Sequence, residues 1–108
     1  MIKKTCNCQQ YAPYKLFFSS LANLNRLGII ITLRQGKKTV SEICQTTGFE
    51  QTMVSHNLKR LEHCGMVFGE QNGKYRFYSV NQKTIKPLLI MIDSHIKKYC
   101  CKILEGVR

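Results

Sequence analysis

Residues 39–67, TVSEICQTTGFEQTMVSHNLKRLEHCGMV, contain two short helical patterns separated by a tight turn. Thr39 and Glu42 have the spacing of a capping box, which indicates the start of a helix. Gly48 stands where that helix would end, and residues 50–64 form the second pattern. Two short helices joined in this way predict a helix-turn-helix unit.

The second of these helices has two chemically different faces. Val54, Leu58 and Leu61 recur at helical spacing and predict a buried stripe. The outward side carries hydroxyls, amides, an imidazole and cations, which can hydrogen bond base edges in a major groove or hold phosphates. The residues predicted to contact DNA are Gln51, Thr52, Ser55, His56, Lys59 and Arg60. The alternative interpretation is a solvated helix face without a partner.

After Gly65 the apolar period changes from helical spacing to two. Residues 66–68 and 75–80 read as two strands, and the Asn72-Gly73 pair between them favours a type I′ hairpin turn. A β-hairpin directly after a helix-turn-helix is a wing. Its basic tip adds two further predicted DNA contacts, Lys74 and Arg76.

Helices are also expected on both sides of this unit. Residues 14–24 have helical spacing, and in the apolar block 27–33 Asn25 as a cap and Gly36 as a stop favour helix over a buried strand. A last helix begins near Thr84, which keeps a proline in its first turn. Its long apolar stripe is formed by Ile85, Leu88, Leu89, Ile92, Ile96, Tyr99 and Ile103.

The composition bounds the partners. The chain has 108 residues with 17 Lys+Arg and 6 Asp+Glu, a net charge of +11 that favours a polyanion. We expect a flexible cysteine-bearing tail at 1–13 and one domain at 14–108. A domain of this size is marginally stable alone, and its own elements offer little surface to cover the last apolar stripe. A homodimer is therefore expected.

Other classes of protein fit the sequence poorly. Six cysteines without a hydrophobic signal segment argue against a secreted disulfide scaffold, and the longest apolar stretches are too short to span a bilayer. This pattern predicts a soluble protein in a reducing, cytoplasmic setting without a membrane. No nucleophile, base and orienting group stand at a recognisable spacing, so we do not expect an enzyme.

From about Tyr14 to Ile103 the chain resembles the ArsR/SmtB family of winged-helix repressors. The resemblance rests on LANLNRL at 21–27, VSEI at 40–43 and TMVSHNLKRL at 52–61, followed by EHCGMV at 62–67 and a short wing. It implies a mainly α winged helix-turn-helix fold with a small β-hairpin, dimerised through its first and last helices. It also implies recognition helices in successive major grooves of a palindromic operator, and release of DNA when an effector binds.

The effector sites of the family match only in part. A thiolate site on the supporting helix would need cysteines where Thr39 and Ser41 stand, and Cys44 alone falls on that motif. The zinc site on the last helix begins with Asp-x-His, which Asp93 and His95 match without the second half. We therefore expect Cys44 to pack in the core, and Asp93 and His95 to be a surface polar group and an interface histidine.

The remaining candidates are two cysteine pairs near the ends of the chain, Cys6 with Cys8 and Cys100 with Cys101. Adjacent helical residues point about 100° apart, so a site built from both pairs is favoured. The resemblance implies that the tail emerges beside the last helix of a dimer, which would bring the pairs together. Clustered thiolates suit As(III), Cd(II), Zn(II) or Cu(I), as an effector that folding does not require. The cysteines could instead be unligated or pack at the dimer interface.

The sequence thus predicts a homodimeric transcriptional repressor that leaves its DNA operator when terminal cysteines bind a soft metal or metalloid such as arsenite. Two alternatives stay open. The same fold could sense oxidation or persulfides through a disulfide between tail and helix. A constitutive DNA-binding protein without an effector would also be strongly basic, with weak sequence preference.

Overall fold

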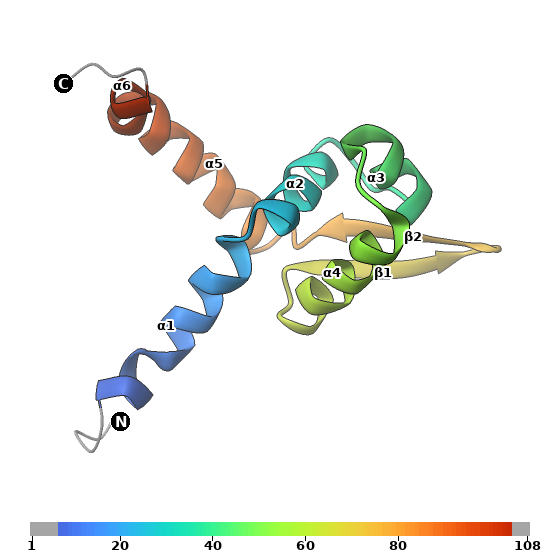
Figure 1. The fold of residues 1–108 in the computed structure, drawn as a ribbon, viewed down its shortest axis with the longest axis horizontal. Helices are drawn as coiled ribbons and strands as arrows, with labels where there is room; N and C mark the ends of the chain where they lie inside the picture. The colour runs from blue at the N-terminus through green and yellow to red at the C-terminus, as the bar shows by residue number, and fades with distance from the viewer. Residues whose placement is uncertain (1–6, 105–108) are drawn as a thin grey trace.

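The computed structural model describes residues 7–104 (Figure 1). The elements in chain order are α1 (Asn7–Leu21), α2 (Leu24–Leu33), α3 (Val40–Thr47), α4 (Gln51–His63), β1 (Val67–Asn72), β2 (Tyr75–Val80), α5 (Ile85–His95), the π-helix η1 (Ile96–Cys100) and α6 (Cys101–Leu104). Figure 1 shows α2 through β2 packed together, while α1 and α5–α6 extend from one side and diverge. We call α2 through β2 the body, and α1 and α5–α6 the arms. The predicted mainly α fold with a winged helix-turn-helix is confirmed.

The body is held by one apolar core. Val54, Leu58 and Leu61 of α4 are fully buried, as the stripe predicted. They pack in a cluster with residues of α2, α3 and the hairpin: Ile29, Ile30, Leu33, Ile43, Met66, Val67 and Val80. The core packs the buried side of α4 against its neighbours, and the opposite side of α4 faces solvent.

The local signals around α3 act as predicted. The Thr39 side chain accepts a hydrogen bond from the Glu42 amide, and the Glu42 carboxylate accepts one from the Thr39 amide, which completes the capping box. Gly48 ends the helix in the left-handed conformation, with φ of 79°. These two ends set the short turn from α3 to α4.

Two helix starts differ from expectation. Asn23, and not Asn25, caps α2, because its side-chain oxygen accepts the Arg26 amide hydrogen at 3.1 Å and Asn25 is already inside the helix. α1 begins at Asn7, so residues 7–13 of the expected flexible tail are helical, and residues 1–6 lie outside the described chain. Pro13 lies inside α1, where it has no backbone N–H to donate to the helix.

The hairpin forms with a different turn. Asn72 pairs with Tyr75, so the two turn residues are Gly73 and Lys74 rather than Asn72 and Gly73. Gly73 has a φ of 67° and Lys74 has no positive φ, which is the pattern of a type II′ turn and not of type I′. Two backbone hydrogen bonds between Lys38 and Tyr78 attach the hairpin to the segment before α3.

The last helix is less regular than its apolar stripe predicted. Pro87 lies in the first turn of α5, as expected, and Ile85 and Leu89 are buried. The helix then passes into η1, where the Cys101 amide donates to the Ile96 carbonyl five residues back. A π-turn shifts the following residues around the axis, so a constant helical period does not hold over the whole stripe.

Among residues 10–104, no single helix is long and apolar enough to cross a membrane. Gln10–Leu21 and Leu24–Leu33 reach that length and composition only when taken together, and the two segments are bent by 73°.

Candidate functional site

The outward face of α4 carries every α4 residue predicted to contact DNA. All six side chains, from Gln51 to Arg60, are exposed on the side opposite the buried stripe. His56, Lys59, Arg60 and His63 line a shallow hollow of about 290 Å³ along the helix. A surface that combines cations with imidazole and hydroxyl groups can hold phosphate oxygens and hydrogen bond bases.

The two wing cations differ in their surroundings. Lys74 lies in the turn at the tip, exposed, with its ammonium 5.7 Å from the centre of the Tyr75 ring. Arg76 turns back toward α4 and forms an ion pair of 3.1 Å with Glu62. Its pKa is raised by Tyr78 and then by Glu62. The two predicted wing contacts therefore differ, because the Glu62 carboxylate offsets the charge of Arg76 and the charge of Lys74 has no such partner among the described residues.

One cation beside the wing was missing from the sequence-based set. Lys37 is exposed in the segment between α2 and α3, and its ammonium lies 5.5 Å from the centre of the Phe77 ring on β2. The bridge between Lys38 and Tyr78 holds this segment against the hairpin. Such a long-range pairing leaves no local signal in the sequence, so Lys37 could not be assigned to the wing from spacing alone.

Of the four terminal cysteines, the structure describes the side chains of Cys100 and Cys101. Cys6 lies outside the described residues, and Cys8 lies in the first turns of α1. Cys100 ends η1 and Cys101 starts α6, both half-buried, and the Cys101 thiol lies 2.9 Å from the Lys97 carbonyl. Figure 1 shows the start of α1 and α6 at the far ends of diverging arms. Among the described side chains, which include neither Cys6 nor Cys8, no group of three or more potential metal ligands occurs.

The partial zinc motif on α5 is occupied by other contacts. Arg34 donates to the Asp93 carboxylate at 2.6 Å, and this hydrogen bond lowers the pKa of Asp93. His95 packs against Tyr99 with the ring centres 4.9 Å apart. Among the side chains that the structure describes, no third potential ligand joins Asp93 and His95.

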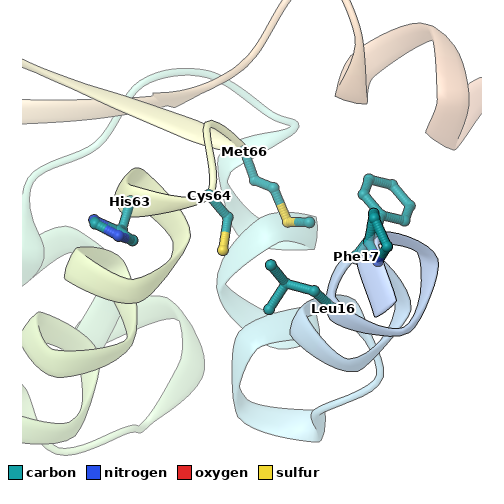
Figure 2. Close-up of a pocket in the computed structure, with 6 residues that line it drawn as sticks. Leu16, Phe17, His63, Cys64 and Met66 are labelled. Atoms are coloured by element: carbon teal, nitrogen blue, oxygen red, sulfur yellow. The ribbon is translucent and has the colours of Figure 1, made fainter. Parts of the chain in front are cut away.

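The two remaining cysteines pack near the core. Cys44 is half-buried on α3 against the core cluster, as predicted. Cys64 follows α4, and its sulfur lies 3.5 Å from the buried Ser20 hydroxyl of α1. Cys64 lines a cavity of about 320 Å³, and Figure 2 shows it among the other lining residues. This cavity separates Leu16 and Phe17 of α1 from the residues after α4.

The arms leave apolar surface uncovered. α1 exposes 65% of Tyr14 and 62% of Phe18, and the last arm exposes 56% of Tyr99. An apolar groove of about 480 Å³ runs between α1, α2 and α5. Its walls are lined by Phe17, Phe18, Leu21, Ala22, Leu27, Ile31, Leu88, Leu89, Ile92, Asp93 and Ile96.

Comparison with known proteins agrees with this architecture. The family described as "Bacterial regulatory protein, arsR family" matches residues 23–67, from the cap of α2 into β1. The chain is 36% identical over 70 residues to the HTH-type transcriptional regulator NmtR of Mycobacterium tuberculosis. Residues 23–67 carry a helix-turn-helix domain of the ArsR family. The NmtR alignment covers 65% of this chain and 58% of NmtR.

A second curated relative and one solved structure are similar to the chain over most of its length. The HTH-type transcriptional repressor SmtB of M. tuberculosis is 28% identical over 76 residues, which are 70% of this chain and 56% of SmtB. The solution structure of apo-NmtR aligns with a TM-score of 0.72 at 29% identity, over 90% of this chain and 82% of that one. The chain spans little more than half the length of these curated relatives.

A further structure shows the same fold. The homodimeric winged helix-turn-helix domain of Mb0332 from Mycobacterium bovis aligns with a TM-score of 0.75 at 23% identity, over 97% of this chain and 95% of that one. NmtR and SmtB are named as transcriptional regulators and not as enzymes, in agreement with the sequence-based expectation.

Proposed function

We propose that this protein is a homodimeric transcriptional repressor that binds operator DNA and leaves it when a soft metal or metalloid binds its terminal cysteines. The main support for DNA binding is the exposed polar and basic face of α4. The buried residues of α4 pack in the core, so this face points to solvent. That arrangement is what a recognition helix needs to enter a major groove. The repressor role rests on the family and on the printed function of SmtB.

The DNA contacts divide by chemistry. Thr52, Ser55 and His56 are exposed and carry groups that can hydrogen bond base edges. Lys59 and Arg60 are exposed cations suited to phosphates. Lys74 would contact the backbone next to the groove from the wing tip. The net charge of +11 adds attraction that does not depend on sequence.

The exposed apolar surface of the arms supports the dimer. Phe18, Tyr14 and Tyr99 are large side chains that gain stability when a second copy covers them. The groove between α1, α2 and α5 would be filled in the same interface. A two-fold dimer presents two copies of α4 to successive major grooves, about 34 Å apart, which favours a palindromic operator.

The effector site is proposed between subunits. The start of α1 and α6 are separated in one chain, so a shared site would have to be completed by the partner. Cys6 and Cys8 of one subunit would then join Cys100 or Cys101 of the other, a thiolate set suited to As(III), Cd(II) or Zn(II). Binding there would change the angle between subunits, and it releases DNA only if the metal prefers the dimer that does not fit the operator.

DNA binding is tested by selecting duplexes from a random pool with the reduced protein and footprinting the strongest. We expect a palindromic site whose affinity exceeds that of random DNA by about a thousandfold or more. Equal affinity for all duplexes, with only a steep salt dependence, would support the constitutive DNA-binding alternative and overturn the proposal.

The effector is tested by titrating As(III), Cd(II) and Zn(II) into the operator complex. Release of DNA by at least one of them is expected, and its loss in the variant with Ser at positions 6, 8, 100 and 101. Cys44→Ser is the matched control, because Cys44 packs against the core away from the termini. Release by peroxide or persulfide alone would support the redox alternative instead.

A further inference from the structure

Arg26 connects α1 to the rest of the molecule through its side chain. Its Nε donates to the carbonyl of Ser20 at 2.7 Å, and one Nη donates to the carbonyl of Ser19 at 3.2 Å. These carbonyls lie in the last turn of α1, where helical carbonyls lack partners within the helix. A guanidinium there also complements the negative end of the helix dipole.

The same guanidinium reaches the recognition helix. Its other Nη donates to the Oδ1 atom of Asn57, in the middle of α4, at 3.2 Å. Asn57 is 7% exposed, and its Nδ2 donates to the Met53 carbonyl at 2.9 Å. Both polar ends of the Asn57 side chain are therefore engaged on the inner side of α4, where they do not face the DNA surface.

Apart from Arg26, α1 meets the end of α4 through the 3.5 Å contact of Ser20 with Cys64 and through a surface that leaves a cavity. Leu16 and Phe17 face His63, Cys64 and Met66 across the cavity of about 320 Å³ in Figure 2. Sparse apolar packing allows one helix to tilt against another, because few atoms resist the motion. The hydrogen bonds of Arg26 are directional and join the two helices at fixed points.

We propose that Arg26 is a positioning residue that fixes the angle between α1 and the recognition helix through Asn57. The inference rests on the proposed function, in which α1 lies in the subunit interface. Since α1 then belongs to the dimer axis and α4 to the DNA surface, the Arg26–Asn57 bond sets the spacing of the two recognition helices. A change in the subunit angle would reach α4 by the same route.

The test uses the full-length dimer and two duplexes, one with both operator half-sites and one with a single half-site. Asn57→Leu and Arg26→Gln should each weaken binding to the complete operator about tenfold, the typical size of one coupling interaction. Binding to the single half-site should change by less than about twofold, because each α4 face is intact. The double variant should resemble either single variant, since both remove one link.

Arg34→Gln is the matched control. Arg34 is a second arginine of the α2 region, it pairs with Asp93 of α5, and α4 takes no part in that contact. It should leave the operator-to-half-site ratio unchanged. Arg26→Lys, which keeps a cation for the α1 carbonyls but lacks the planar fork, should lie between wild type and Arg26→Gln.

Operators with altered half-site spacing separate positioning from simple stability. The variants should lose preference for the selected spacing while their melting temperatures and dimer dissociation constants stay near wild type. An equal loss on both duplexes, an unchanged operator-to-half-site ratio, or additive effects in the double variant would overturn the inference. A wild-type protein without any operator preference would overturn the proposed function first, and this inference with it.

Discussion

The body and the arms differ in how much of their apolar surface is buried within one chain. Leu58 and Leu61 in the body are fully buried within one chain, whereas Leu16 and Phe18 of α1 are 55% and 62% exposed. The body therefore closes its core within one chain, although Leu24, Ile31, Phe68 and Tyr75 remain exposed on its surface. The arms contribute Leu21, Ile85 and Leu89 to the same core, but other large apolar side chains of the arms, such as Phe18 and Tyr99, stay exposed. We therefore assign the arms to the subunit interface.

The largest expected effect is the loss of stability caused by a substitution in the core of the body. Leu58→Ala should lower the free energy of unfolding by about 2–5 kcal/mol, because it leaves a cavity in a closely packed core. Leu16→Ala removes the same atoms from an exposed site on α1 and should change the stability of the dilute protein by less than about 0.5 kcal/mol. Urea denaturation below the dimer dissociation constant measures both. Equal losses would contradict the division between body and arms.

The next largest expected effect is the weaker dimerisation caused by a substitution in the groove between the arms. Ile92→Glu places a carboxylate in the apolar groove and should weaken dimerisation about a hundredfold, or about 2.7 kcal/mol. Ile90→Glu is the control, since Ile90 lies on the same helix but outside the groove lining. Sedimentation equilibrium reports both dissociation constants. A dimer that tolerates Ile92→Glu would place the interface elsewhere.

A smaller effect separates the two wing cations. Lys74→Ala should weaken operator binding a few fold and reduce the salt dependence by about one phosphate contact. Arg76→Ala should change the salt dependence less, because Glu62 already offsets the Arg76 charge. Fluorescence anisotropy between low and moderate salt measures both slopes. A larger change for Arg76 would mean that its ion pair opens on DNA.

The smallest effect concerns the contact between the body and the last arm. Arg34 lowers the pKa of Asp93, so this pair stabilises the fold above the ordinary aspartate pKa of about 3.9 and loses that contribution as the pH falls through the lowered value. Asp93→Asn should therefore be slightly less stable at pH 7, and the difference should vanish in acid. Thermal melts of the two proteins across this pH range test the sign. A difference that grows in acid would contradict it.

The sequence predicted the body better than the arms for a physical reason. Capping at Thr39, the left-handed Gly48 and the buried spacing of Val54, Leu58 and Leu61 are local signals, and each acts in the structure as expected. The prediction was wrong where two nearby residues could both cap the same helix. Asn23 caps α2 in place of Asn25, for example.

The candidate site was predictable to the extent that it depends on one helix. The outward residues of α4 follow from the period of the buried stripe. The ion pair of Arg76 with Glu62, the place of Lys37 beside Phe77 and the bond between Arg26 and Asn57 join distant segments. Such contacts depend on tertiary packing, which no spacing rule encodes. The divergence of the arms likewise had to come from the structure.

The most direct test is native mass spectrometry of the reduced protein with its selected operator, with and without As(III), Cd(II) or Zn(II). Without metal we expect two chains on one duplex. With at least one of these ions we expect a metal-bound dimer without DNA, and the variant with Ser at positions 6, 8, 100 and 101 should stay on the duplex. A single chain on the duplex, or a dimer that keeps its DNA when loaded with each of the three ions, would contradict the proposed function.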